Sequence, residues 1–152
     1  MRAINHSLTG ALIGLTISEP LIAAPLALAS HYVMDVIPHH GFNRRGNAKI
    51  TNRYFIASLY IDAVLCLALV LVLIFSRPIN WLLAIVCAFI AAAPDFLSIN
   101  RFAKSLKKKS WKPNLYSKFA SSIQWFERPI GAVVEATWFV AMIICVSIFV
   151  RH

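Results

Sequence analysis

Long apolar runs with few polar interruptions dominate the chain. Three of them, at residues 54–76, 79–100 and 130–150, reach the length that a helix needs to cross a bilayer, which is about 20 residues. The pattern therefore predicts three transmembrane helices.

The first 37 residues are also apolar, but they are too long for one spanning helix at a rise of about 1.5 Å per residue. Ser18, Glu19 and Pro20 interrupt them. A proline favours the first turn of a helix and disfavours helical geometry in the residue before it. We therefore predict a helical hairpin over residues 1–37, with arms at 3–17 and 20–36, that is either two short spans or a re-entrant pair.

A different periodicity follows Pro113 and Asn114. Apolar residues recur there at helical spacing within an otherwise polar stretch, which predicts an amphipathic helix on the membrane surface. They are Leu115, Phe119, Ile123 and Phe126. The fold class expected from the whole pattern is all-α, a single domain over residues 1–152 built as an integral membrane helical bundle.

Composition supports this class. The 152 residues are 59% hydrophobic and 14% charged, with a mean hydropathy of +0.70. These values are typical of a membrane protein and exclude an ordinary soluble domain. The three cysteines, Cys66, Cys87 and Cys145, lie in apolar runs without CxxC spacing, so neither a disulfide framework nor a thiolate metal site is indicated.

Basic residues are distributed unevenly about the predicted spans. All but two of the 15 lysines and arginines fall on the side that holds both ends of the hairpin, and the exceptions are Arg77 and Arg151. The positive-inside rule then places the N-terminus in the cytoplasm and the C-terminus outside. The basic segment 101–129 is expected to contact anionic lipid headgroups and not nucleic acid, because such a loop between spans is the ordinary topological signal.

Acidic residues interrupt the apolar runs at similar depth. Asp62, Asp95 and Glu135 lie inside predicted spans, and Asp35 ends the hairpin. A lone carboxylate in hydrocarbon costs about 2.5 to 3.5 kcal/mol on insertion scales. All four lie in the cytoplasmic half, so we expect them to face inward and share a cation.

The stretch "ASHYVMDVIPHHG" (residues 29–41) adds histidines to these acids. His31 and Asp35 are four residues apart and share one helix face. Pro38 ends the helix and lets His39 or His40 fold back, without indicating which. Imidazole and carboxylate ligands without thiolate suit zinc, manganese or iron, and magnesium where carboxylates dominate.

Each of these residues also has a local interpretation. His31 and Asp35 could simply form a hydrogen bond with each other at a helix end. Asp62 could bond a nearby hydroxyl group such as that of Ser58 or a tyrosine. Glu135 could pair with Arg128 or with a helix N-terminus. The shared depth of the groups favours a common site over three separate contacts.

Four segments resemble a known family: "NHSLTGALIG", "LASHYVMDVIPHHG", "APD" and "IQWFERPIGAVVE". They are similar to small bacterial integral membrane proteins described as predicted membrane-bound metal-dependent hydrolases, which share features with zinc-dependent phospholipase C-like sequences. The resemblance is strongest at a HxxxDxxPH signature and implies a helical bundle in the bacterial inner membrane. Family members often carry histidine where this chain has Ser121 and Ser122. The implied metal ligands are His6, His31, Asp35, His39, Asp62 and Asp95.

The expected function is a metal-dependent phosphoester hydrolase acting on a lipid or lipid-linked substrate at the cytoplasmic face. Zinc is the first choice among divalent metals, with manganese, iron or magnesium as alternatives. Asp62 or Asp95 would act as the catalytic base. Further candidates are Arg44, Arg45 and Lys107 for the phosphate, and His40 and Glu135 as additional ligands.

Two other functions stay open. One is a membrane protein in which the metal is only structural. The other is an ion carrier, which is disfavoured because the outer halves of the first and last spans contain no ionisable residue. The sequence leaves the oligomeric state open.

Overall fold

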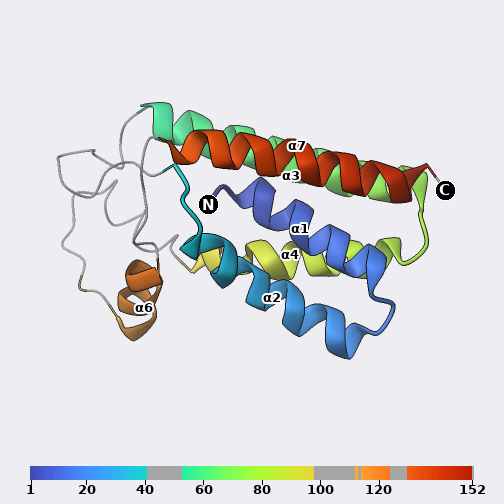
Figure 1. Cartoon of the computed structure of the whole chain (residues 1–152), viewed down its shortest axis with the longest axis horizontal. Coiled ribbons are helices and arrows are strands. Elements are labelled where there is room, and N and C mark those ends of the chain that lie inside the picture. Colours follow the sequence, from blue (N-terminus) through green and yellow to red (C-terminus); the bar gives the residue numbers. More distant parts are fainter. Residues whose placement is uncertain (41–52, 98–111, 113, 124–129, 152) are drawn as a thin grey trace.

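The computed structural model describes residues 1–40, 53–97, 112, 114–123 and 130–151, and their regular secondary structure is α-helical. Two of the six helices within these residues are long and apolar. Figure 1 shows the helices as a bundle with α6 at one end. The helices are α1 (Ala3–Thr16), α2 (Pro20–Val36), α3 (Arg53–Ser76), α4 (Trp81–Phe96), α6 (Leu115–Ile123) and α7 (Gly131–Val150).

The N-terminal hairpin forms as the sequence predicts. Helix α1 ends at Thr16, and α2 begins at Pro20, whose fixed φ suits the first helical position. The Glu19 side chain caps α2 by accepting a hydrogen bond from the Leu21 amide at 3.4 Å. The two arms run in opposite directions, so both ends of the hairpin lie at the same end of the bundle (Figure 1).

The predicted spans differ in length. Helix α3, over Ile56–Ser76, and helix α7, over Gly131–Val150, are long and apolar enough to cross a membrane. Helix α4 has only 16 residues, from Trp81 to Phe96, and is about 24 Å long at a rise of about 1.5 Å per residue. It begins later than expected because Asn80 adopts a left-handed conformation (φ 63°). The predicted 79–100 helix was thus too long at its start, and residues 98–100 lie outside the described part of the chain.

Helix α1 lies at the centre of the bundle and packs on α2, α3, α4 and α7. Its closest neighbour is α4, because Gly10 and Gly14 bring the two backbones together. A Cβ atom on Gly10 would lie 2.3 Å from the Cys87 carbonyl oxygen, and one on Gly14 would lie 2.6 Å from Ala84 Cα. This spacing of two glycines is typical of close helix contacts in membranes.

The ends of the bundle are distinct. The N-terminus and α6 lie at one end, and the C-terminus lies at the other (Figure 1). The turns that join α1 to α2 and α3 to α4 meet at the far end, where Asn80 donates a hydrogen bond to Ser18 at 3.0 Å. The charged groups described below all lie at the N-terminal end.

Helix α6 forms within the basic segment, over Leu115–Ile123. Leu115 is 86% exposed and Phe119 49% exposed, and the Phe119 ring meets the edge of Tyr32 on α2. The predicted amphipathic helix is therefore present over these residues, whereas its last expected apolar position, Phe126, lies outside the described part.

Candidate metal centre

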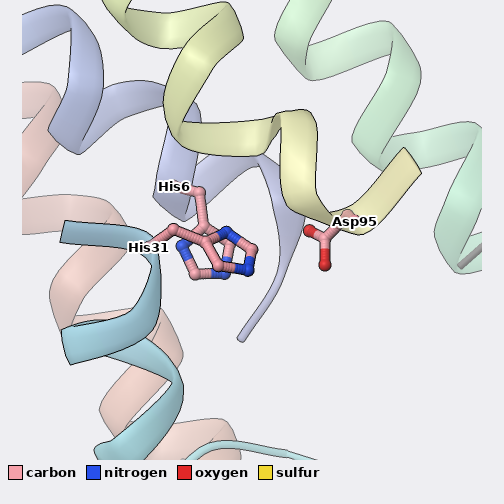
Figure 2. Close-up of side chains that lie close together, drawn as sticks. All are labelled: His6, His31 and Asp95. Atoms are coloured by element: carbon pink, nitrogen blue, oxygen red, sulfur yellow. The ribbon is translucent and has the colours of Figure 1, made fainter. Parts of the chain in front are cut away.

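Three helices place potential metal ligands at one point near the N-terminal end of the bundle. His6 comes from α1, His31 from α2 and Asp95 from α4. One ligand atom from each lies within 4.8 Å of the others. Figure 2 shows the Asp95 carboxylate beside the two imidazole rings, which stack with centroids 4.1 Å apart. Two nitrogens and one oxygen are a common donor set for zinc.

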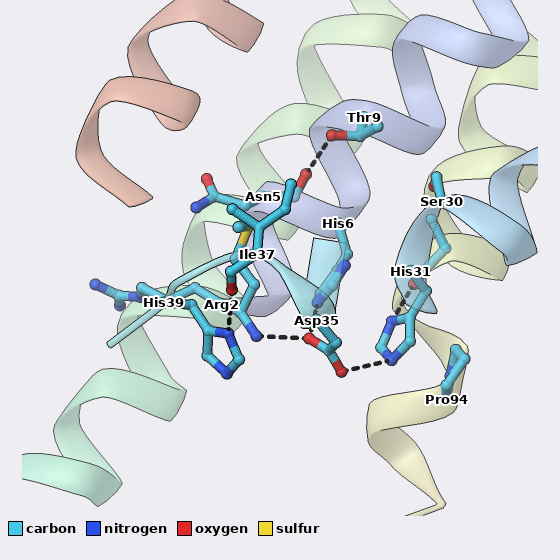
Figure 3. A network of polar contacts seen from close by, with 12 residues as sticks. Arg2, Asn5, His6, Thr9, Ser30, His31, Asp35, Ile37, His39 and Pro94 are labelled. Atoms are coloured by element: carbon cyan, nitrogen blue, oxygen red, sulfur yellow. Dashed lines mark hydrogen bonds and ion pairs between the residues drawn. The ribbon is translucent and has the colours of Figure 1, made fainter. Parts of the chain in front are cut away.

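Asp35 lies beside both histidines and is almost fully buried. Its Oδ1 lies 3.3 Å from His6 Nε2, and its Oδ2 lies 3.4 Å from His31 Nε2. The Met1 amino group also contacts Oδ1, at 2.7 Å. Figure 3 shows Asp35 between His6 and His31. The expected pairing of Asp35 with His31 is therefore present, and it extends to a second histidine on α1.

The hydrogen bond on the other side of the His31 ring fixes its tautomer. His31 Nδ1 lies 2.8 Å from the Ala91 carbonyl oxygen, which only accepts hydrogen bonds. Nδ1 therefore carries a proton, and neutral His31 turns the lone pair of Nε2 toward the carboxylates. Metal-binding histidines are commonly oriented in this way by a backbone carbonyl.

His6 has no such bond. Its side chain is 0% exposed, and among the described residues Nδ1 has no hydrogen-bond partner, while Nε2 has only its 3.3 Å contact with Asp35. A buried polar group without a partner costs about 1 to 3 kcal/mol, so its presence calls for an explanation. A bound cation would provide one.

Proline shapes the third element of the cluster. Pro94 lies in the last turn of α4, and its carbonyl accepts a hydrogen bond from the Tyr116 hydroxyl of α6 at 3.0 Å. Burial, together with the neighbouring Tyr32, raises the pKa of Tyr116 to about 12, so the hydroxyl remains a donor at neutral pH. Helix α6 is thereby fixed beside the turn that carries Asp95.

Asp62 and Glu135 belong to a second group, centred on Arg2. The Arg2 guanidinium donates from Nε to Asp62 at 3.0 Å and from Nη2 to the Ser58 carbonyl at 3.3 Å. The Arg2 backbone amide donates to Glu135 at 3.0 Å. Because Arg2 is the N-cap of α1, Glu135 bonds a helix N-terminus, as one of its two local interpretations expected; the other expected partner, Arg128, lies outside the described residues. Asp62 bonds Arg2 and does not join the cluster of His6, His31 and Asp95.

The remaining candidate ligands lie apart from the cluster or outside the described residues. His39 is buried beside the start of α7, where a Cβ atom on Gly131 would lie 2.1 Å from the His39 carbonyl carbon. Its Nδ1 lies 2.8 Å from the Ile37 carbonyl oxygen. His40 is exposed. The predicted phosphate ligands Arg44, Arg45 and Lys107 lie outside the described part of the chain.

Sequence reasoning missed the role of Arg2. It is the basic residue next to the arm that carries His6, and it was interpreted only as a topology signal. Three acids in apolar helices need cationic partners, and this requirement was the signal that could have identified it. Among the described residues, Asp35 pairs with the Met1 amino group and Asp62 with the Arg2 guanidinium, whereas Asp95 has no ion pair.

Comparisons with known proteins leave this site to be judged on its geometry. No family model, curated protein or solved structure matches the chain.

Proposed function

We propose that the protein is a membrane-embedded metal-dependent hydrolase that cleaves a phosphoester in a lipid or lipid-linked substrate. The observation that carries the proposal is the pair of buried histidines. His31 has Nδ1 on a backbone carbonyl, which leaves Nε2 for an ion, and His6 is fully buried with Nδ1 unpartnered and Nε2 only in contact with Asp35. Asp95 supplies an oxygen within 4.8 Å of both.

The membrane setting is part of the proposal. Many large apolar side chains point outward, including Leu21 (84% exposed), Phe75 (82%) and Ile79 (82%). Such a surface needs an apolar environment. Two helices are long enough to cross the bilayer, and the shorter α4 and the hairpin would complete the bundle within it. The basic residues favour a cytoplasmic N-terminus in the inner membrane of a bacterium.

The residues of the cluster divide into distinct roles. His6, His31 and Asp95 would hold the ion, for which zinc is the first choice. When bound, the ion would polarise a phosphoryl oxygen and lower the pKa of a bound water toward about 7. Asp35 contacts the Nε2 atoms of both imidazoles and would supply a further oxygen to the same ion. Asp62 is held by Arg2 and Asp35 by the Met1 amino group, so of the two carboxylates expected to act as the base, Asp95 is the one without a cationic partner among the described residues.

One observation favours a second function, in which the metal is structural and no reaction occurs. His6, His31 and Asp35 are each at most 3% exposed. A closed site of this kind is typical of metals that hold helices together. The partly exposed Asp95 is the side from which a substrate would have to approach.

Two matched variants test the proposal. Purified wild-type protein should contain about one equivalent of metal by elemental analysis. Asp95→Asn should lose it, because an amide is a weaker ligand than a carboxylate, whereas Asp62→Asn should keep it, because that carboxylate binds Arg2.

Hydrolysis is then measured with phospholipids and polyprenyl phosphates, in the presence of zinc, manganese or magnesium and in a chelated control. Metal-dependent release of phosphate or headgroup that disappears in Asp95→Asn would support the enzyme. Bound metal without turnover would favour the structural alternative. Metal-free wild-type protein that gains no stability from added metal would refute both.

A further inference from the structure

A cavity of about 450 Å³ lies on the other side of α1 from His6 and His31, and helices α1, α3 and α7 line it together with His40. Helices α3 and α7 both pack on α1 but hardly contact one another. One end of the cavity is polar, with Arg2, Asn5 and Glu135. The other is apolar, with Leu65 and Phe139.

Asn5 points to a ligand in this cavity. The side chain is 1% exposed, and its Nδ2 donates to the Glu135 backbone carbonyl at 3.2 Å. A carbonyl only accepts, so the amide orientation is fixed and Oδ1 is left as an acceptor. Oδ1 is buried and has no hydrogen-bond partner. The ligand should therefore bring a hydrogen-bond donor, such as a hydroxyl group.

Arg2 supplies the complementary chemistry. A guanidinium has five N–H donors, and the hydrogen bonds to Asp62 and Ser58 use the Nε hydrogen and one on Nη2. The side chain is 38% exposed and lines the cavity. The remaining donors suit an anionic oxygen, for which arginine is a good partner. Glu135 also lines the cavity, and its carboxylate would repel a ligand head group that is only anionic. A head group that also carries a hydrogen-bond donor therefore suits the cavity better.

The dimensions suit one acyl chain. Lining residues run from Ser58 to Leu65 on α3 and from Ala132 to Phe139 on α7. Each stretch advances seven residues, or about 10 Å along its helix. The volume lies near the lower end of the range for ligand pockets, about 300 to 1,000 Å³. It accommodates a small polar head and the first part of a single chain, but not two chains side by side.

We propose that this cavity binds a lysophospholipid, with its phosphate at Arg2, its free glycerol hydroxyl on Asn5 Oδ1 and its acyl chain between Leu65 and Phe139. The site is separate from the histidine cluster and does not rest on the proposed hydrolysis. The experiment is therefore done with a chelator present, so that a failure of the metal chemistry leaves its outcome unchanged.

Native mass spectrometry of the full chain in detergent provides the test, with palmitoyl lysophosphatidylethanolamine as the probe. Ala136→Phe would fill the cavity, and Val133→Phe is its control because Val133 is 64% exposed and does not line it. We expect at least tenfold weaker binding in Ala136→Phe and in Asn5→Leu, and wild-type binding in Val133→Phe. Equal binding by wild type and Ala136→Phe would overturn the proposal.

Two other lipids test the specificity. Diacyl phosphatidylethanolamine that binds as tightly as the probe would overturn the single-chain assignment. Palmitic acid that binds as tightly would overturn the role of the hydroxyl group. A photoactivatable lysophospholipid on wild-type protein needs no variant to fold, and its cross-links should fall near Leu65 and Phe139. Cross-links confined to α2 or α6 would contradict the site.

Discussion

Replacing His6 by leucine should make the metal-free protein more stable. The imidazole is 0% exposed, its Nδ1 has no hydrogen-bond partner, and its Nε2 has only the contact with Asp35. Leucine has a similar size and no polar atom to leave unsatisfied. The change therefore removes a buried polar group from the folded state, where such groups are unfavourable.

The magnitude follows from two opposing effects. Removing an unsatisfied buried group gains about 1 to 3 kcal/mol. The change also removes the 3.3 Å contact between His6 and Asp35, but Asp35 keeps the Met1 amino group and His31. We expect a net gain of about 1 to 2 kcal/mol, which raises the melting temperature by about 2 to 8 °C for a chain of this size.

Bound metal should make the wild type more stable than His6→Leu, which reverses their order in the metal-free state. At a free metal concentration 100 times its dissociation constant, binding stabilises the wild type by about 2.7 kcal/mol. His6→Leu lacks one of the three ligands and should gain almost nothing. Wild type should thus melt below the variant in chelator and above it in zinc.

The assay is thermal unfolding in detergent, followed by circular dichroism, with and without zinc. His40→Leu is the control, because His40 is exposed and lies outside the cluster. It should respond to zinc as the wild type does. A His6→Leu protein that is less stable in chelator, or that zinc stabilises as much as the wild type, would refute the reasoning about His6.

Three further predictions concern the packing around the cluster. Gly10→Val should destabilise the protein by about 1 to 3 kcal/mol and weaken metal binding, because the side chain would push α1 from the backbone of α4; unchanged melting and metal content would contradict the close contact. Arg2→Gln should lower stability by about 1 to 3 kcal/mol by leaving the largely buried Asp62 without its partner, and Arg2→Gln combined with Asp62→Asn should recover much of that loss in the same melts. Tyr116→Phe should release α6 from α4, which faster proteolysis within α6 would reveal, whereas equal cleavage of both proteins would show that the hydrogen bond is unimportant.

Much of the fold could be predicted because its signals are local. Proline at position 20 marks the start of α2, and apolar runs mark α3 and α7. The start of α4 could not be predicted in this way, since it depends on the left-handed conformation of Asn80 in the turn. The sequence also does not indicate which helix packs on the glycine pair of α1. The structure shows that it is α4, whose small residues lie against Gly10 and Gly14.

The candidate site was predictable only in outline. Spacing alone paired His31 with Asp35, and shared depth brought in His6 and Asp95. Depth could not separate Asp95 from Asp62, because two acids at the same level along the bundle can face different helices. In the structure, Arg2 at the start of α1 bonds Asp62, whereas His6 on another side of the same helix lies beside Asp95.

Helix α1 accounts for this division. Gly10 sets α1 against α4, and residues about one turn earlier on that side therefore face α4 and α2, which is where His6 meets Asp95 and His31. Asn5 and Arg2 face α3 and α7 instead, and there Arg2 neutralises Asp62. The acid on the arginine side therefore has its cation within the protein, whereas Asp95 on the histidine side contacts none among the described residues. Because an uncompensated carboxylate in an apolar bundle is costly, the side without an arginine is the one where an external cation contributes most to stability.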